Sequence, residues 1–496
     1  MSRSIPSLTV CDHDVSVTTT PTDRRAERVF DSLADAVGDT PLVRLRAVSA
    51  RDDVQIWAKL EYLNPGGSSK DRAAAAMILD AERRGLLRPG GTIVEGTSGN
   101  TGIALAQFGA ARGYRTVVVA PDKTSEEKLA ILRAHGAEVV IAPSGVPADH
   151  PDYVRNQARR IADSIDGGWL TGQYDNPANP AAHEATTGPE IWRQTAGTVT
   201  HLVAGIGTGG TITGTGRFLK AQGAVTVIGA EPEGSNYSLP RSAEPHAEGE
   251  HAWYIEAVGH FRHPRSPVDD WPDSYDAGVI DAIEVIPDAT ALATLHHVAR
   301  HEGLLVGGSS GTALAAAARV AETAAPGAVI VAVLPDSGRA YLSKYFSPDW
   351  LARWGFDDLT AKPTGVPLPR IPTLSVSLTV GEAIHRWPDG YDSALVTLRT
   401  GPRTVAAEVA GSVRRSALND ADPNDPIERH VRRALVAGRR ESLDVARSRL
   451  ASIGPEPEDL VALSDRGFVD TVVKWRDFTH HADSHPQLEH REDRRR

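Results

Sequence analysis

A lysine in a glycine-rich turn is the residue of this chain that most strongly predicts chemistry. Lys70 follows the run Asn64-Pro65-Gly66-Gly67-Ser68-Ser69, and a second loop of small polar residues lies at positions 96–102. A lysine amine attacks an aldehyde only when it is deprotonated, so its site must lower the pKa by desolvation or nearby positive charge. Taken alone, Lys70 fits a surface cation equally well. Together with two loops whose free N–H groups suit an anion, it indicates a Schiff-base lysine.

A third glycine-rich loop, residues 205–211, follows an apolar run and precedes a helical stretch that extends to about Ala221. Its position predicts a monophosphate site at a helix N-terminus. The backbone amides and hydroxyls that would hold the phosphate belong to Gly207, Thr208, Gly209, Gly210 and Thr211.

The same loop supports an alternative of another class, a nucleotide-dependent dehydrogenase. Gly205, Gly207 and Gly210 match the dinucleotide fingerprint, and Glu231 follows about 20 residues later at the end of a strand. This alternative leaves Lys70 without a role, whereas a phosphate-bearing aldehyde uses all three loops. The aldehyde hypothesis is therefore favoured.

A fourth cluster, residues 307–312, precedes an alanine-rich helix expected from Ala313 to about Ala325. The hydroxyl of Ser309 is suited to a pyridine nitrogen, which it would leave largely unprotonated. The weaker electron sink that results suits β-elimination. The alternative for Ser309 is a plain helix N-cap.

Composition favours small-molecule chemistry. The chain has 496 residues and 41% apolar content, which predicts two to three folded domains. Its 53 Lys and Arg against 64 Asp and Glu oppose binding to nucleic acid or anionic lipid. The single cysteine, Cys11, excludes an internal disulfide framework and a thiolate-rich metal cluster. With no apolar stretch near the roughly 20 residues of a membrane span, we expect a cytoplasmic protein.

Short apolar runs alternate with helical stretches between about Leu42 and Leu334, which indicates a mostly parallel sheet covered by helices on both faces. The predicted strands are residues 54–60, 92–94, 116–120, 139–141, 202–204, 225–230 and 329–334. A capping box of Thr124 and Glu127 and a start at Asn100 predict two of the helices.

Changes in composition predict five segments. Residues 1–25 are expected to form a disordered arm, 26–356 the catalytic domain, 357–373 a proline-spaced linker, 374–479 a C-terminal domain and 480–496 a charged tail. In the C-terminal domain, residues 379–386 and 442–450 have helical patterns, while 394–398 and 469–473 have strand patterns. The two halves faintly repeat a helix, strand, strand, helix order.

These motifs give the chain a close resemblance, from about Asp31 to Phe356, to the pyridoxal-phosphate-dependent cystathionine β-synthase and cysteine synthase family. The matching stretches are VGDTPL from Val37, GGSSKDR around Lys70, TSGNTG from Thr97, TTGPEI from Thr186, GTGGT from Gly207, GGSSG from Gly307 and LPDS from Leu334. The resemblance implies an α/β fold of type II with two mostly parallel sheet subdomains, a smaller α+β C-terminal domain, and a homodimer or higher homo-oligomer.

The resemblance also assigns roles. Lys70 would bind pyridoxal 5'-phosphate covalently and carry the Cα proton. Asn100 would bind the ring hydroxyl, Ser309 the ring nitrogen, and residues 207–211 the phosphate. The substrate residues would be Thr97, Ser98, Thr101 and Gln173, with Tyr174 beside them.

The phrases Gly172-Gln173-Tyr174 and Pro335-Asp336-Ser337-Gly338-Arg339-Ala340-Tyr341, with the long extension, resemble the cystathionine β-synthase branch. The leading hypothesis is therefore β-replacement on L-serine by L-homocysteine to give cystathionine. The alternative is a cysteine synthase that uses O-acetylserine and sulfide.

Two departures from the family pattern qualify this hypothesis. Ala257 stands where the family usually has glycine, and residues 261–268 resemble an insertion, so acceptor preference is open. His260 and His263 are interpreted as part of a solvated loop and not as a metal site.

One hypothesis for the C-terminal domain is a pair of diverged CBS modules, which bind adenosyl ligands in relatives. Asp470 stands where the ribose-binding pattern has serine or threonine, so adenosyl binding stays open. A haem is not supported, because Cys11 and His13 lie in the arm without the family's ligand spacing.

Overall fold

This computed structural model describes residues 29–239, 253–260, 271–356 and 372–478, apart from gaps at 50, 98, 144–145, 147–148, 388–389, 399–403, 405, 434, 439–440, 442, 452–459, 466–467 and 476–477. Several predictions therefore fall outside the described residues: the N-terminal arm, the charged tail, Ser98, the whole insertion at 261–268 and nearly all of the linker.

The larger sheet has six strands in the order β1-β2-β10-β7-β8-β9. They are β1 (Leu42–Leu45), β2 (Gln55–Leu60), β7 (His201–Gly205), β8 (Thr226–Pro232), β9 (Ala282–Ile286) and β10 (Val329–Leu334). All neighbours are parallel except β1 and β2. Every residue of β10 is buried, as is typical of a central parallel strand covered on both faces.

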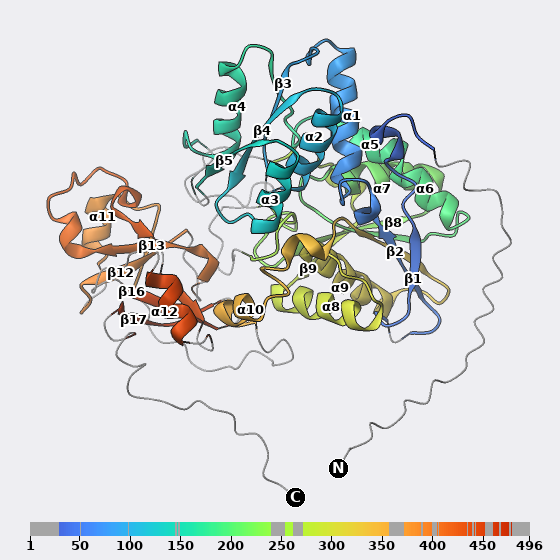
Figure 1. Cartoon of the computed structure of the whole chain (residues 1–496). Coiled ribbons are helices and arrows are strands. Elements are labelled where there is room, and N and C mark those ends of the chain that lie inside the picture. Colours follow the sequence, from blue (N-terminus) through green and yellow to red (C-terminus); the bar gives the residue numbers. More distant parts are fainter. Residues whose placement is uncertain are drawn as a thin grey trace, which may run out of the picture.

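The smaller sheet has four parallel strands in the order β5-β4-β3-β6. They are β3 (Thr92–Gly96), β4 (Arg115–Pro121), β5 (Glu138–Ala142) and β6 (Gly168–Leu170). Figure 1 shows this sheet with α2 to α4 as a separate lobe above the larger sheet. The two predicted sheet subdomains are therefore present.

Helices cover both sheets. Up to residue 356 they are α1 (Lys70–Arg83), α2 (Asn100–Ala111), α3 (Glu126–Ala134), α4 (Val154–Ser164), α5 (Ala178–Ala185), α6 (Thr187–Gln194), α7 (Gly210–Gln222), α8 (Asp288–His301), α9 (Gly308–Thr323) and α10 (Pro348–Trp354). Short 3-10 helices are η2 (Leu33–Ala36), η3 (Glu61–Leu63), η4 (Ala277–Val279) and η5 (Gly338–Tyr341). None of the helices in the described part of the chain is both long and apolar enough to cross a membrane.

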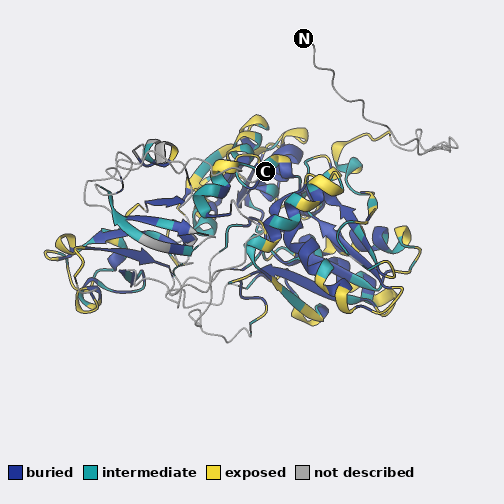
Figure 2. Ribbon diagram, turned by 90° about the horizontal axis from the view of Figure 1, so that it is seen from below, coloured by how far each residue is buried: buried dark blue, intermediate teal, exposed yellow. Residues whose placement is uncertain are grey.

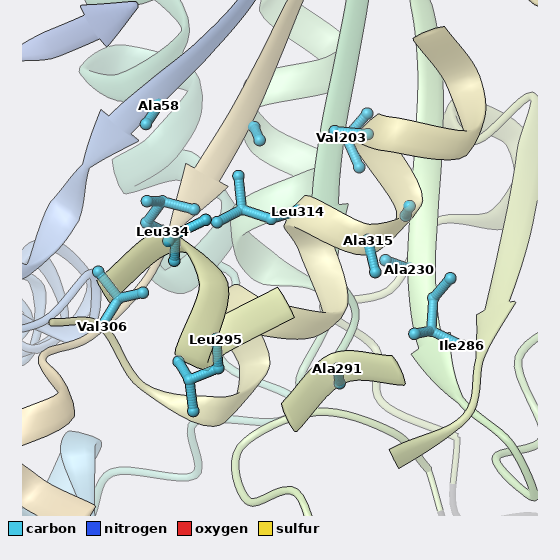
Figure 3. Packing of buried hydrophobic residues seen from close by; sticks show 14 of the residues in the cluster. Ala58, Val203, Ala230, Ile286, Ala291, Leu295, Val306, Leu314, Ala315 and Leu334 are labelled. Carbon is cyan, nitrogen blue, oxygen red and sulfur yellow. The ribbon is translucent and has the colours of Figure 1, made fainter. Parts of the chain in front are cut away.

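Apolar residues from β2, β7, β8 and β10 pack against α8 and α9 to form the largest core cluster. Figure 3 shows Leu314 and Ala315 of α9 between the sheet and Leu295 of α8. The many alanines of α9 leave room for the helix to approach the sheet closely, and most of its residues are buried. Figure 2 shows buried residues in the interior and exposed residues on outer helices and loops.

The C-terminal unit contains the same motif twice. In the first copy β11 (Thr373–Ser375) is parallel to β12 (Ser393–Thr397) across α11 (Val380–His385), and β12 is antiparallel to β13 (Val409–Arg414). In the second, β15 (Val436–Gly438), α12 (Leu443–Ala451), β16 (Leu460–Asp465) and β17 (Phe468–Lys474) repeat this arrangement. The remaining elements are β14 (Arg432–Arg433), η6 (Ala406–Glu408), η7 (Arg415–Leu418) and η8 (Ile427–His430).

The register of the two copies also agrees. Thr397 pairs with Ser375 and Val409, and Ser464 pairs with Gly438 and Val469. Each hairpin has its irregularity immediately before this residue. The sequence indicated a faint repeat in the order helix, strand, strand, helix, whereas the order in each copy is strand, helix, strand, strand.

The seven strands predicted before residue 335 are all present, whereas β1, β6 and β9 were not predicted. Two boundary predictions were wrong. The cap of α3 is Ser125, whose hydroxyl accepts from the Lys128 amide, and the Thr124 hydroxyl has no partner. The helix expected from Ala313 begins at Gly308, with Gly307 as its N-cap, so Ser309 lies inside the first turn.

Candidate active site

Lys70 is the first residue of α1 and lines a pocket at the carboxyl ends of β7 and β10. The preceding turn is fixed because the Ser69 amide donates to the Pro335 carbonyl at 2.8 Å and Ser68 bridges to Asp336. Burial lowers the pKa of the Lys70 amine below its ordinary value; Asp336 opposes this shift and the positive charge of Lys128 adds to it. A larger neutral fraction of the amine is available for attack on an aldehyde.

The loop of residues 207–211 forms one wall of this pocket and leads into α7. Gly209 is the N-cap with φ of +86°, a conformation that glycine adopts without strain. The first turn of a helix leaves N–H groups unsatisfied, so the wall suits an anion. All of the predicted phosphate residues except Gly210 line the pocket directly.

Buried side chains hold the phosphate loop from behind. The Asn179 amide donates to the Gln173 carbonyl at 2.8 Å and to the Thr208 hydroxyl at 3.1 Å. The Thr211 hydroxyl lies 3.1 Å from Nε2 of His183, and burial lowers the pKa of this imidazole to about 3. His183 is therefore neutral and supports the loop without adding charge.

The Ser309 hydroxyl is available to a ligand in the pocket. Its hydroxyl lines the pocket, is buried and has no hydrogen-bond partner in the protein. A buried hydroxyl without a partner is costly unless a ligand atom supplies one. This orphaned donor, opposite an anion-binding loop, fits a pyridine ring that carries a phosphate.

The predicted substrate residues lie at the smaller lobe. Thr101 donates to the Gln173 side chain at 2.5 Å, and Thr97 accepts from the Gly99 amide at 3.3 Å. Behind them the Glu95 carboxylate accepts from the amides of Gly96 and Gln173, and burial raises its pKa to about 7. These residues are adjacent to the pocket and not among those that line it.

Tyr174 is placed differently from the other substrate residues. The Arg155 guanidinium lies 4.9 Å from the centre of its ring, and the Tyr174 carbonyl accepts from the Ser274 amide. The structure thus places Tyr174 in contact with α4 and not along the pocket.

Asn100, at the first residue of α2, connects to the pocket through a residue that the sequence analysis did not select. Its amide donates to Asp336 Oδ2 at 2.7 Å, and the Tyr341 hydroxyl donates to the same oxygen. Asp336 belongs to the LPDS motif, which was the available signal. Lys128, on α3, also donates to the Tyr341 hydroxyl. It belongs to none of the motifs described above, so the sequence offered no reason to select it.

A buried ion network anchors α1. Arg72 donates to Glu61 and Glu190 at 2.7 Å, and Lys59 donates to Glu190 at 2.6 Å. Burial opposes ionisation of Glu61, but Arg72 and Lys59 hold its pKa at about 2. Because Arg72 lies two residues after Lys70, this network fixes the start of the helix.

Two sequence interpretations need correction. His260 is buried against Tyr237 and Trp271, with ring centroids 5.5 and 5.0 Å apart, so it does not lie in a solvated loop. His263 is outside the described residues. In the part of the chain that is described, no group of three or more metal-ligating side chains occurs.

The dinucleotide alternative requires an acidic residue, Glu231, that is free to bind a ribose. Glu231 is fully buried, and its two carboxylate oxygens accept from the amides of Tyr237 and Ser238 at 2.9 and 2.8 Å. The carboxylate is committed to the backbone and is not free for a ribose.

Comparisons with known proteins agree with this geometry. Residues 33–336 match the family described as pyridoxal-phosphate dependent enzyme. The chain is 39% identical over 355 residues to cystathionine β-synthase of Apis mellifera, covering 70% of this chain and 68% of that protein. It is 41% identical over 315 residues to cysteine synthase B of Salmonella typhimurium, covering 63% of this chain and 95% of that protein.

Solved structures give the same result. A crystal structure of O-ureido-L-serine synthase matches with a TM-score of 0.56 and 39% identity, over 64% of this chain and 94% of the other. The O-acetylserine-dependent cystathionine β-synthase from Helicobacter pylori matches with a TM-score of 0.56 and 36% identity, over 64% and 98%. By its family match over residues 33–336 and its similarity to these relatives, this chain belongs to the pyridoxal-phosphate-dependent enzymes of the cystathionine β-synthase and cysteine synthase group.

Proposed function

We propose that the protein catalyses β-replacement on L-serine, in which the hydroxyl group is exchanged for the sulfur of L-homocysteine to give cystathionine. The observation that carries this proposal is the Lys70 amine, with its lowered pKa, between the loop of residues 207–211 and the Ser309 hydroxyl. Similarity to cystathionine β-synthases and cysteine synthases supports the reaction class.

Bound pyridoxal phosphate supplies an electron-withdrawing ring that makes the Cα hydrogen of the attached amino acid acidic. Residues 207–211 would hold its phosphate, Asn100 its hydroxyl and Ser309 its nitrogen. Thr97, Ser98, Thr101 and Gln173 would orient the substrate carboxylate.

Lys70 is assigned the proton transfers. Among the described residues that line the pocket, it is the only one with an acidic or basic side chain, and burial lowers the pKa of its amine. It would take the proton from Cα and deliver one to the departing hydroxyl oxygen, since hydroxide is a poor leaving group. The thiol would then give its proton to Lys70, its sulfur would bond to the carbon that the hydroxyl left as water, and Lys70 would return a proton to Cα.

A cysteine synthase that uses O-acetylserine and sulfide is the second candidate. The specific observation in its favour is 41% identity over 95% of cysteine synthase B. Acetate leaves without the help of a strong acid, so in that reaction Lys70 would not need to protonate the leaving group.

Steady-state assays of the purified yellow protein distinguish the two. Serine with homocysteine, O-acetylserine with sulfide and O-acetylserine with homocysteine should be compared by kcat/KM. We expect the first pair to be used best; a clear preference for O-acetylserine with sulfide would contradict the proposal. Lys70→Ala should abolish borohydride trapping of the cofactor.

We further infer that the C-terminal unit is a pair of diverged CBS modules, supported by its two β-α-β-β copies in matching register. Calorimetry with S-adenosylmethionine tests an adenosyl effector. The absence of both binding heat and a change in rate would count against an adenosyl effector.

A further inference from the structure

One buried ammonium group joins three loops around the pocket. Lys128, on α3, is completely buried, and its Nζ donates to Glu256 at 2.9 Å and to the Tyr341 hydroxyl at 2.7 Å. Its stem also lies against Gly99: a Cβ at that glycine would be 2.5 Å from Lys128 Cδ. The Lys128 side chain therefore contacts all three segments that carry these residues, 96–102, 253–260 and 336–345.

The first branch of this group leads to Asn100. The Tyr341 hydroxyl accepts from Lys128 and must therefore turn its own proton to Asp336 Oδ2. That oxygen also accepts from the Asn100 amide at 2.7 Å. Since one amide proton of Asn100 is committed to Asp336, the direction of its second proton and of its carbonyl is fixed as well.

The second branch leads to the pocket wall. Glu256 precedes Ala257, which lines the pocket, and its carboxylate is bonded to both Lys128 and Lys344. Its amide donates to the Tyr345 hydroxyl at 2.7 Å. Burial opposes ionisation of Glu256, but the two lysines hold its pKa below the ordinary value.

A contribution to stability alone does not explain why the Lys128 ammonium and the Glu256 carboxylate are buried together. Removing an ammonium and a carboxylate from water costs about as much as their attraction returns, and apolar side chains of similar size often serve as well. Lys128 lies on α3 of the smaller lobe (Figure 1). Tyr341, together with Ile255 and Val258 on either side of Glu256, belongs to the core cluster of the larger sheet. The contacts of Lys128 are thus directed to groups beside the pocket from both lobes.

We propose that Lys128 is a positioning residue for the reaction, which orients Asn100 through Tyr341 and Asp336 and fixes the pocket wall at Ala257 through Glu256. This proposal rests on the proposed use of the pocket. Its two branches predict separable effects, one on the cofactor and one on the acceptor thiol.

The test compares four variants of the full-length holoenzyme by absorption spectrum, cofactor dissociation and KM for each substrate. Lys128→Met keeps the stem and removes the charge; it should change the visible spectrum and lower kcat/KM for the amino-acid donor by about tenfold or more. Tyr341→Phe should reproduce the spectral change. Glu256→Gln should raise KM for the thiol and leave the spectrum as it is.

Lys344→Met is the matched control, because the Lys344 ammonium also bonds Glu256, whereas the Tyr341 hydroxyl is bonded by Lys128. Its spectrum should be that of the wild type. If Lys128→Met loses stability while its spectrum and KM values match those of the wild type, the role is structural and the proposal fails.

Should Lys128→Met not fold, Tyr341→Phe decides: a wild-type spectrum and donor KM in that variant would overturn the proposal. A colourless wild-type protein would refute the proposed function as well. The two failures are therefore distinguishable.

Discussion

Replacing Arg72 with methionine tests whether the ion network behind α1 fixes the catalytic lysine. The guanidinium bonds two buried carboxylates, Glu61 and Glu190, and only Lys59 would then remain to compensate them. Removing one partner of a buried ion pair costs about 3–5 kcal/mol.

The pKa of Glu61 gives an independent magnitude. It is lowered from 4.5 to about 2, and at about 1.4 kcal/mol for each tenfold change this corresponds to about 3 kcal/mol. Because the folded-state pKa is depressed, this stability is fully present above pH 4.5 and is lost as the pH falls toward 2. The penalty of Arg72→Met should therefore be largest near neutral pH and shrink below about pH 4.5.

Urea unfolding followed by the absorption of the bound cofactor measures this penalty in the catalytic unit. Arg112→Met is the control, because Arg112 makes a similar two-bond contact with Glu82 at a half-exposed position. It should cost about 1 kcal/mol or less. A loss below about 1 kcal/mol in Arg72→Met at pH 7 would refute the reasoning.

Three further predictions follow from single positions. Gly210→Ala would bring a Cβ within 2.1 Å of Asn179 Oδ1, so the cofactor dissociation constant should rise at least about tenfold. Gly223→Ala, whose Cβ would meet nothing closer than 3.6 Å, should leave it unchanged. Ala257 has φ of +66°, which is strained for a residue with a side chain, and Ala257→Gly should widen the pocket and raise the kcat/KM ratio of homocysteine over sulfide severalfold. Burial raises the pKa of Asp288 to about 7, so stability falls as the pH rises from about 4 through 7; Asp288→Asn should flatten this fall in unfolding experiments.

The parallel architecture could be predicted because buried strands are apolar along their whole length, as β10 is. The short strand β6 has three residues, and β1 and β9 have partly exposed patterns, so none carries that signal. The two copies in the C-terminal unit became evident only from strand pairing.

The cofactor pocket could be predicted for a different reason. Its glycines and hydroxyls are consecutive in the chain, so Lys70, Ser309 and the loop of residues 207–211 each form a local motif. Lys128 and Tyr341 are 213 residues apart, and a lysine on a helix normally indicates a solvated surface. Only the fold shows that this lysine is buried.

The aromatic residue at the end of α10 has a consequence for how the chain can be divided. Trp354 packs against both the main catalytic core and a C-terminal core. A Cβ at Gly438 would lie 1.9 Å from the Ala352 carbonyl oxygen. The Ser464 hydroxyl donates to the Arg353 carbonyl oxygen at 2.6 Å. Dividing the chain within the proline-spaced linker, residues 357–373, would therefore expose the Trp354 indole on one fragment and the apolar surface that it contacts on the other. Each fragment should aggregate more readily than the intact polypeptide, and an excision that respects packing must decide which side keeps this helix.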